Sequence, residues 1–192
     1  MGEWLASGKQ FTIGEYLEMA AHAREKLEYV NGKITPMPAG TINCNLIAHN
    51  LAFGLGLLLD TKPEYRIFSS DQRIWVPAKN SFVYPDALVV CGAPMPAEAD
   101  PTAITNPLLI VEVLPRSTKE YDRSLKFQLY QTIDSFQEYV LVQQDEPELF
   151  HYRREGADLW RIGSVAGLEA LLPLKCLGVE VPLARIYRNV EL

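Results

Sequence analysis

The sequence predicts an α/β fold of the mixed α+β kind, with a central mixed β-sheet flanked by helices. Helical and strand-type patterns do not alternate regularly along the 192 residues, so a repeating βαβ arrangement is not expected. Most predicted strands instead follow one another directly. Two of them, "DALVV" and "LLIVEVL", are nearly continuous apolar runs, which is typical of strands that are covered on both faces.

Three segments have the apolar spacing of helices. The first begins with Thr12 and Glu15, a pair that can form a capping box. Ser117 and Glu120 repeat this pattern at the start of the third segment. The second segment is apolar enough for a helix buried on much of its surface, although it contains two glycines. The helices are expected at residues 11–26, 43–60 and 117–133.

Short apolar runs bounded by polar or turn residues predict the strands. In "LEYVNGKITPM", the pair Asn31-Gly32 suits a tight type I′ turn and predicts a hairpin. No internal repeat and no long linker interrupts the pattern, so residues 1–192 are expected to form one domain. The tail after residue 163 has mixed signals. The other strands are expected at residues 65–69, 72–76, 82–91, 108–114, 136–142, 148–154 and 159–163.

Composition excludes several classes of protein. The net charge of −6 argues against a protein that coats nucleic acid nonspecifically, but a nuclease with acidic metal ligands remains compatible with it. No apolar run reaches the ~20 residues that span a bilayer, and the N-terminal stretch lacks signal-peptide features, so no membrane association and a cytoplasmic location are expected. The cysteines and histidines are scattered and predict neither disulfides nor a zinc site.

Two acids interrupt the apolar strands, Asp86 in "FVYPDALVV" and Glu112 in "NPLLIVEVL". Acids are seldom fully buried unless something compensates their charge. If segment 91–106 returns the chain so that the two strands pair antiparallel, Val90 lies near Leu108. Asp86 then lies near Glu112, and a divalent metal is the commonest way to hold two such carboxylates together. Mg²⁺ with a few carboxylates, waters and a substrate phosphate indicates phosphodiester chemistry.

The third predicted helix can bring Lys126 to these acids. Lys126 lies about 12 Å along that helix, and its side chain reaches about 6 Å back toward the helix N-terminus. Glu112 lies about 7 Å from the end of its strand, so the ammonium and the carboxylates can meet. A lysine beside a metal site can orient or deprotonate water, or stabilise a negatively charged transition state.

Each of these residues also has a simpler interpretation. Asp86 follows Pro85 and can hydrogen-bond the main chain at a bend. Glu112 can pair with a buried lysine or arginine. Lys126 can form an exposed i, i+4 pair with Asp122.

The blocks "FTIGEYLEM", "LEYVNGKI", the acid after a proline, the glutamate ending the next strand, "KFQLY" and "EYVLV" occur in a specific order. In that order the chain resembles the Uma-type restriction endonucleases, a branch of the PD-(D/E)xK nuclease superfamily. The resemblance implies a restriction-endonuclease-like core with Asp86 and Glu112 as metal ligands. It also implies that Glu28 completes the site, whereas the sequence alone predicts an exposed hairpin residue there.

Two positions depart from the pattern. The superfamily has a lysine two residues after the glutamate, where this chain has Leu114, so the resemblance implies a lysine relocated to the helix as Lys126. Relatives often carry a histidine where this chain has Cys44.

These observations lead us to expect an endonuclease that depends on Mg²⁺ or Mn²⁺ and acts on DNA. Asp86, Glu112 and Glu28 would hold the metal, and Lys126 would assist the attacking water. A homodimer with two symmetric sites is the simplest arrangement for cutting a duplex. Two alternatives are a catalytically inactive nuclease-fold module that binds nucleic acid or protein, and a sugar hydrolase with a carboxylate pair.

Overall fold

The structure is a computed structural model, and it describes residues 9–114 and 125–192. The elements are α1 (Ile13–His22), β1 (Leu27–Val30), β2 (Lys33–Pro36), α2 (Ile42–Leu59), β3 (Tyr65–Ser69), β4 (Ile74–Val76), η2 (Pro77–Lys79), β5 (Ser81–Val83), β6 (Ala87–Cys91), β7 (Leu109–Leu114), α3 (Phe127–Tyr130), β8 (Glu138–Gln143), β9 (Glu148–Arg154), β10 (Trp160–Ala166), β11 (Leu171–Leu174), β12 (Val179–Pro182) and α4 (Leu183–Ile186).

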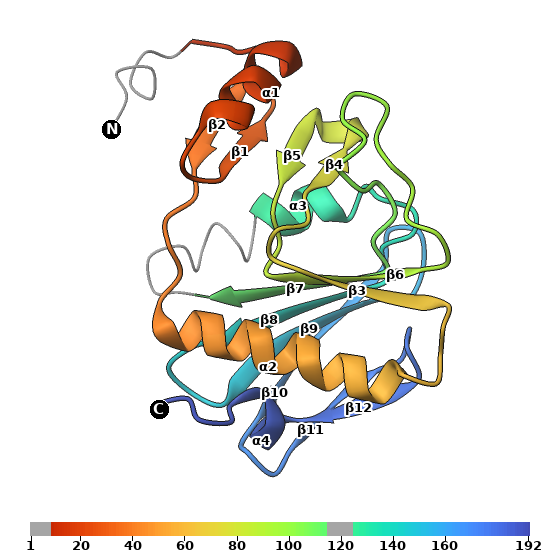
Figure 1. The fold of residues 1–192 in the computed structure, drawn as a ribbon. Coiled ribbons are helices and arrows are strands. Elements are labelled where there is room, and N and C mark those ends of the chain that lie inside the picture. The colour runs from red at the N-terminus through yellow and green to blue at the C-terminus, as the bar shows by residue number, and fades with distance from the viewer. Residues whose placement is uncertain (1–8, 115–124) are drawn as a thin grey trace.

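The strands form a large sheet and two smaller ones (Figure 1). The six-stranded sheet has the order β10-β9-β8-β7-β6-β3, and only β7 and β8 within it run parallel. A four-stranded sheet has the order β2-β1-β5-β4, and β11 pairs with β12. The predicted fold class, a mixed sheet flanked by helices, is confirmed.

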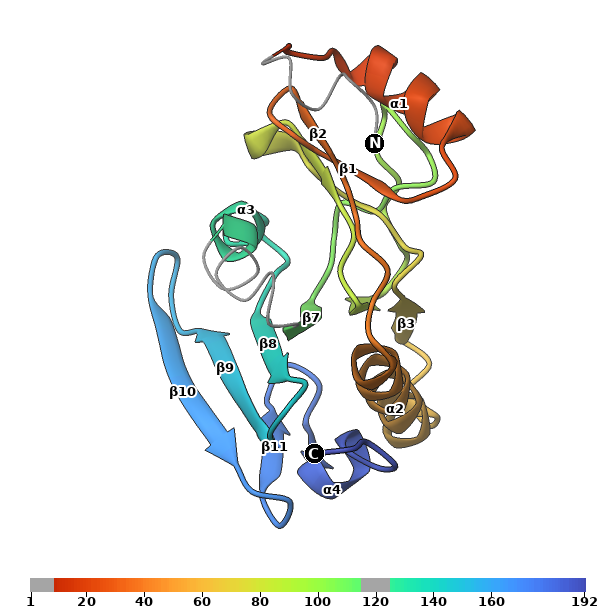
Figure 2. The same cartoon turned by 90° about the vertical axis from the view of Figure 1, so that its left-hand side faces the viewer.

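Two apolar cores cover the faces of the six-stranded sheet. Figure 2 shows α2 and α4 on one side of this sheet and α3 on the other. One core contains α2, α4 and the β11–β12 hairpin, and the other contains α3 and β4. By length and composition α2 is apolar enough to cross a membrane. Its residues Ile47, Leu51 and Leu55 are fully buried in the first core, as expected for a core helix of a folded domain.

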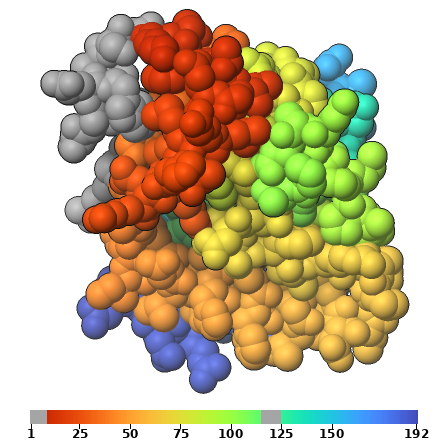
Figure 3. Space-filling model, turned by 45° about the horizontal axis from the view of Figure 1, so that its top comes forward, coloured from red at the N-terminus to blue at the C-terminus, as the bar shows by residue number. Residues whose placement is uncertain are grey.

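The N-terminal elements follow the predicted local chemistry. The Thr12 hydroxyl accepts the Glu15 N–H at 3.2 Å, and the Glu15 carboxylate accepts the Thr12 N–H at 2.8 Å, so the capping box is present. Asn31 and Gly32 both have positive φ angles, 46° and 89°, as a type I′ turn requires. Figure 3 shows α1 and this hairpin lying against the yellow and green segments, with α2 below them.

One predicted strand was wrong in its extent. Residues 82–91 were expected as a single strand, but β5 and β6 belong to different sheets. The chain leaves one sheet and enters the other between Val83 and Ala87, where Pro85 has no N–H to donate to a ladder. The capping residues predicted at Ser117 and Glu120 lie outside the described residues. The C-terminal part of the chain, for which the sequence has mixed signals, forms the end of β10, the strands β11 and β12, and helix α4.

The predicted pairing of the two apolar strands is confirmed. β6 and β7 are antiparallel, with Ala87 opposite Val111 and Val89 opposite Leu109. Continuing this register by one residue places Asp86 opposite Glu112. The strand pairing ends at Ala87, and just before it the Asp86 N–H donates to the Val111 carbonyl at 3.2 Å, which keeps the acid beside β7.

Candidate active site

A buried lysine joins two acids from different sheets. The Lys126 Nζ lies 3.1 Å from Glu112 Oε1 and 3.3 Å from Glu28 Oε1. It also donates to the Tyr84 carbonyl at 3.1 Å. These charged side chains are at most 5% exposed. Lys126 therefore compensates charge at the junction of the four-stranded and six-stranded sheets.

Strand alternation directs Glu112 toward α3. Its neighbours Ile110 and Leu114 pack into the core on the α3 side, and alternate residues of a strand share a face. The Tyr130 hydroxyl donates to Glu112 Oε1 at 2.9 Å. Burial, reinforced by the charge of Glu112, raises the pKa of Tyr130 well above its usual range, so this hydroxyl stays protonated. Lys126 and Tyr130 are four residues apart, and both reach the same carboxylate.

Glu28 is buried, and the expectation of an exposed hairpin residue was wrong. The reason is the strand order, because β1 lies between β2 and β5 and is not an edge strand. Glu28 Oε1 also accepts the Tyr84 N–H at 3.0 Å. The main chain of Tyr84 thus contacts both Glu28, through its N–H, and Lys126, through its carbonyl.

Asp86 lies at the point where the chain enters β6, and it is half-buried. Its Oδ2 accepts the Val113 N–H at 2.6 Å, across the strand pair and beside Glu112. Burial, and to a lesser extent the charge of Asp86, raises the pKa of Cys44 near the start of α2. Asp86 therefore lies close enough to the start of α2 for its charge to act on Cys44.

The simpler interpretations of these residues are partly right. Glu112 does pair with a buried lysine, which is Lys126, and Asp86 does hydrogen-bond main chain. The alternative partner of Lys126, Asp122, lies outside the described residues. What the simpler interpretations omit is that Glu28 and Glu112 meet at the same ammonium.

The two departures from the superfamily pattern occupy ordinary packing positions. Leu114 is 2% exposed and lies in the core on the α3 side. Cys44 is buried, and its thiol donates to the Gln144 side chain at 3.2 Å. Neither side chain brings a charge to the acids.

The carboxylates supply oxygen donors only, the ligand type that Mg²⁺ and Mn²⁺ prefer. Among residues 9–114 and 125–192, no three acid, histidine or cysteine side chains come together closely enough to hold a metal by themselves. Mg²⁺ is commonly bound through one or two carboxylates, with waters and substrate phosphates completing its shell. Asp86 and Glu112 supply the carboxylate oxygens that such a site needs. Glu28, which contacts the same lysine as Glu112, supplies a third carboxylate.

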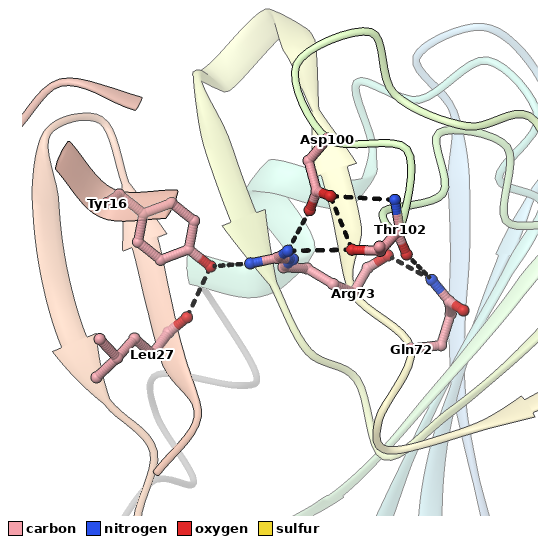
Figure 4. A network of polar contacts seen from close by, with 6 residues as sticks. All are labelled: Tyr16, Leu27, Gln72, Arg73, Asp100 and Thr102. Atoms are coloured by element: carbon pink, nitrogen blue, oxygen red, sulfur yellow. Dashed lines mark hydrogen bonds and ion pairs between the residues drawn. The ribbon is translucent and has the colours of Figure 1, made fainter. Parts of the chain in front are cut away.

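The sequence favours a packed core tyrosine at Tyr130, which is buried in the core on the α3 side, and it does not identify Arg73. For Tyr130 a signal existed, since it lies one helical turn after Lys126. Arg73, at the centre of the network in Figure 4, had no signal, because only the folded chain brings its partners together.

A family model described as "Putative restriction endonuclease", Uma2, matches residues 13–184. The chain belongs to the Uma2 family. Two proteins of Synechocystis sp. are similar over most of their length. Uncharacterized protein sll1609 is 36% identical over 86% of this chain and 93% of its own. Uncharacterized protein slr1290 is 33% identical over 92% of this chain and 90% of its own.

A solved structure has the same fold as this Uma2 chain. It is a putative nuclease of the DUF820 group from Anabaena variabilis, with a TM-score of 0.73 over 92% of this chain and 97% of the other. The two sequences are 17% identical, so the likeness shows the fold alone. The family match supports a nuclease-like function.

Proposed function

We propose that this Uma2 protein is an endonuclease that hydrolyses phosphodiester bonds of DNA and depends on Mg²⁺ or Mn²⁺. The observation that supports this most directly is the contact of Lys126 with Glu112 and Glu28, at the strand junction where Asp86 also lies. Carboxylates that can hold a metal, with a lysine beside them, suit metal-dependent phosphodiester hydrolysis. The family description points to the same chemistry.

In this proposal Asp86 and Glu112 bind the metal, and Glu28 completes the acidic site. The bound metal supplies positive charge to the scissile phosphate and lowers the pKa of a coordinated water. Lys126 has two carboxylates within 3.3 Å, which stabilise its ammonium form. Its role is therefore to orient the attacking water and to stabilise the negative charge that develops on the phosphorane.

Tyr130 and the Tyr84 main chain hold these groups in place. The Tyr130 hydroxyl donates to Glu112, so this carboxylate keeps one orientation at the end of β7. The Tyr84 N–H and carbonyl contact Glu28 and Lys126, respectively. Such preorganisation reduces the reorganisation needed when charge develops in the transition state.

The test is cleavage of supercoiled plasmid with Mg²⁺, Mn²⁺ or EDTA. The wild type should nick DNA only with metal, and Glu112→Gln and Lys126→Ala should each lose at least about 100-fold of the rate. Lys175→Ala, at an exposed lysine, is the matched control for contaminating nuclease and should cut like the wild type. Equal activity in all four proteins would refute the proposal.

A second candidate is a module that binds nucleic acid or protein without cutting. It is favoured by Leu114, which fills the superfamily lysine position with a core side chain, and by the net charge of −6. DNA retained in a gel-shift assay with EDTA, together with no product under any metal, would support this candidate.

We also propose a homodimer, because two symmetric sites can cut the two strands of a duplex. Light scattering coupled to gel filtration measures this directly. A monomeric mass in the presence of DNA and metal would contradict it.

A further inference from the structure

Arg73 is a partly buried cation that the proposed mechanism does not use. It directly precedes β4, and its side chain is 12% exposed. The guanidinium donates to the Tyr16 hydroxyl at 3.0 Å and to the Thr102 hydroxyl at 3.2 Å, and it pairs with Asp100 (Figure 4). Asp100 is held in turn, because its Oδ1 accepts the Thr102 N–H at 3.1 Å. Arg73 therefore joins helix α1 to the loop that contains Asp100.

The contact with Tyr16 leads to Glu28. The Tyr16 hydroxyl donates to the Leu27 carbonyl at 2.8 Å, and Leu27 is the residue before Glu28 on β1. Burial raises the pKa of Tyr16 to about 12, so the hydroxyl keeps its proton and remains a donor. Arg73, Tyr16 and the Leu27 carbonyl thus form a continuous chain of hydrogen bonds that ends beside this acid.

A second contact leads to Lys126. The Arg73 guanidinium lies 5.8 Å from the ring centre of Tyr84 and 5.2 Å from that of Phe82, both within the range of cation–π attraction. The main chain of Tyr84 contacts Glu28 through its N–H and Lys126 through its carbonyl. Displacing the Tyr84 ring would therefore shift both contacts.

These two routes matter because the acids belong to different sheets. Glu28 lies on the four-stranded sheet, whereas Glu112 lies on the six-stranded sheet. Their separation depends on how the sheets are joined. A guanidinium presents its donors in a rigid plane, so it fixes several segments at once, and a lysine cannot replace that geometry.

We propose that Arg73 is a positioning residue for the acidic site, holding Glu28 and Lys126 against Glu112 through Tyr16 and Tyr84. The inference rests on the proposed function, since it concerns how the same site binds its metal. Arg73 itself touches none of the reacting groups. It sets the geometry in which Glu28 can support the metal.

The experiment is calorimetric titration of the DNA-free protein with Mn²⁺, together with the thermal unfolding midpoint of each variant. Arg73→Lys and Tyr16→Phe should each weaken Mn²⁺ binding at least fivefold. Tyr187→Phe is the matched control, because its buried hydroxyl also donates to main-chain carbonyls, those of Gln143 and Glu148. It should lower the unfolding midpoint as Tyr16→Phe does but leave Mn²⁺ binding within twofold of the wild type.

A double-variant comparison separates positioning from general stability. Because both routes act on the contact between Glu28 and Lys126, Arg73→Lys should weaken Mn²⁺ binding less in a Glu28→Gln background than in the wild type. The inference would be overturned if the double variant lost Mn²⁺ affinity by the product of the two single-variant losses. It would also be overturned if a folded Arg73→Lys bound Mn²⁺ as tightly as the wild type. If Arg73→Lys does not fold, the Mn²⁺ affinities of Tyr16→Phe and Tyr187→Phe are compared instead. Weaker binding in Tyr16→Phe alone supports the inference, and equal binding in both contradicts it.

The failure of this inference differs from the failure of the proposed function. A wild type that binds Mn²⁺ and cuts DNA, with unchanged binding in Arg73→Lys and Tyr16→Phe, contradicts only the role of Arg73. A wild type that neither binds Mn²⁺ nor cuts contradicts the proposed function, and the inference falls with it.

Discussion

Two buried glutamates lie on the neighbouring parallel strands β7 and β8, and their surroundings differ. Glu138 begins β8 opposite Leu109, at the other end of the pair from Glu112. Its Oε1 accepts main-chain N–H groups from Lys175 at 2.9 Å and from Cys176 at 3.1 Å. Its Oε2 lies 3.2 Å from the His151 ring. Glu138 thereby fixes the turn after β11 to the sheet.

Glu112 is bound in another way. Among the described residues it contacts Lys126 and Tyr130, side chains of one helical segment, and Lys126 also contacts Glu28. Main-chain donors move only with the backbone, whereas side-chain donors can rearrange around a ligand. The comparison teaches that burial alone does not identify a functional acid, because Glu138 binds the main chain of a turn whereas Glu112 shares a side-chain cation with Glu28.

The largest expected effect on stability comes from removing the structural acid. Glu138→Ala leaves the main-chain N–H groups of Lys175 and Cys176 without this acceptor and opens a space beside the His151 ring, so the free energy of unfolding should fall by about 3–5 kcal/mol. Urea denaturation measures this, with Glu180→Ala at an exposed glutamate as the control. Plasmid cleavage per folded molecule should not change. A loss under 1 kcal/mol would show that Glu138 does not fix the turn.

Removing the cation of the site should have a smaller effect that depends on metal. Lys126→Met leaves Glu28 and Glu112 without their shared ammonium, which should cost about 3 kcal/mol in metal-free protein. Because Mg²⁺ can replace that positive charge, it should raise the unfolding midpoint more in this variant than in the wild type.

The matched control for this variant is Lys26→Met. The ammonium of Lys26 contacts Asp71 and the Ser70 carbonyl, and its side chain is partly exposed. Mg²⁺ should raise the midpoint of Lys26→Met as it does in the wild type. If Lys126→Met responds to Mg²⁺ no more than this control, the metal does not bind beside Lys126.

Tyr130→Phe tests how much a single hydrogen bond to Glu112 contributes to stability and to cleavage. Loss of the 2.9 Å contact to Glu112 should lower the free energy of unfolding by about 1 kcal/mol. It should also reduce the cleavage rate about tenfold with little change in the Mg²⁺ concentration required, because the lost contact orients the acid. A rate equal to that of the wild type would assign Tyr130 to packing alone.

The smallest effect is expected at an exposed acid, Glu15. The hydrogen bond from the Thr12 N–H, helped by Lys9, lowers the pKa of Glu15 from 4.5 to about 2. A lowered pKa stabilises the folded state above the unfolded-state pKa, and this contribution is lost as the pH falls through about 2. Thermal unfolding should separate the wild type from Glu15→Gln at pH 7, and the gap should close between pH 4.5 and 2. A gap that grows toward pH 2 would contradict the assignment.

Much of the fold could be predicted because its signals are local. The capping box at Thr12, the Asn31-Gly32 turn and the apolar runs of β6 and β7 each determine structure within a few residues. The register of β6 and β7 was predictable because one intervening segment connects them. The break between β5 and β6 was missed because both strands are apolar and only the sheet topology separates them.

The candidate site divides in the same way. The proximity of Glu112, Asp86 and Lys126 could be expected from strand pairing and helix reach. Glu28 was implied only by the family resemblance, because its burial depends on β5 covering β1. The structural role of Glu138 could not be predicted from the sequence, since the N–H groups that it binds belong to Lys175 and Cys176, far along the chain. Contacts between segments far apart in the sequence leave no local pattern.

The most direct test compares Glu112→Gln with Glu138→Gln for both plasmid cleavage and thermal unfolding. Glu112→Gln should lose metal-dependent cleavage at least about 100-fold and keep or raise its unfolding midpoint, because it relieves the repulsion between Glu112 and Glu28, which both contact the Lys126 ammonium. Glu138→Gln should cut normally and unfold at a lower temperature. If Glu138→Gln loses cleavage while Glu112→Gln cuts like the wild type, the assignment of the reactive acid is contradicted.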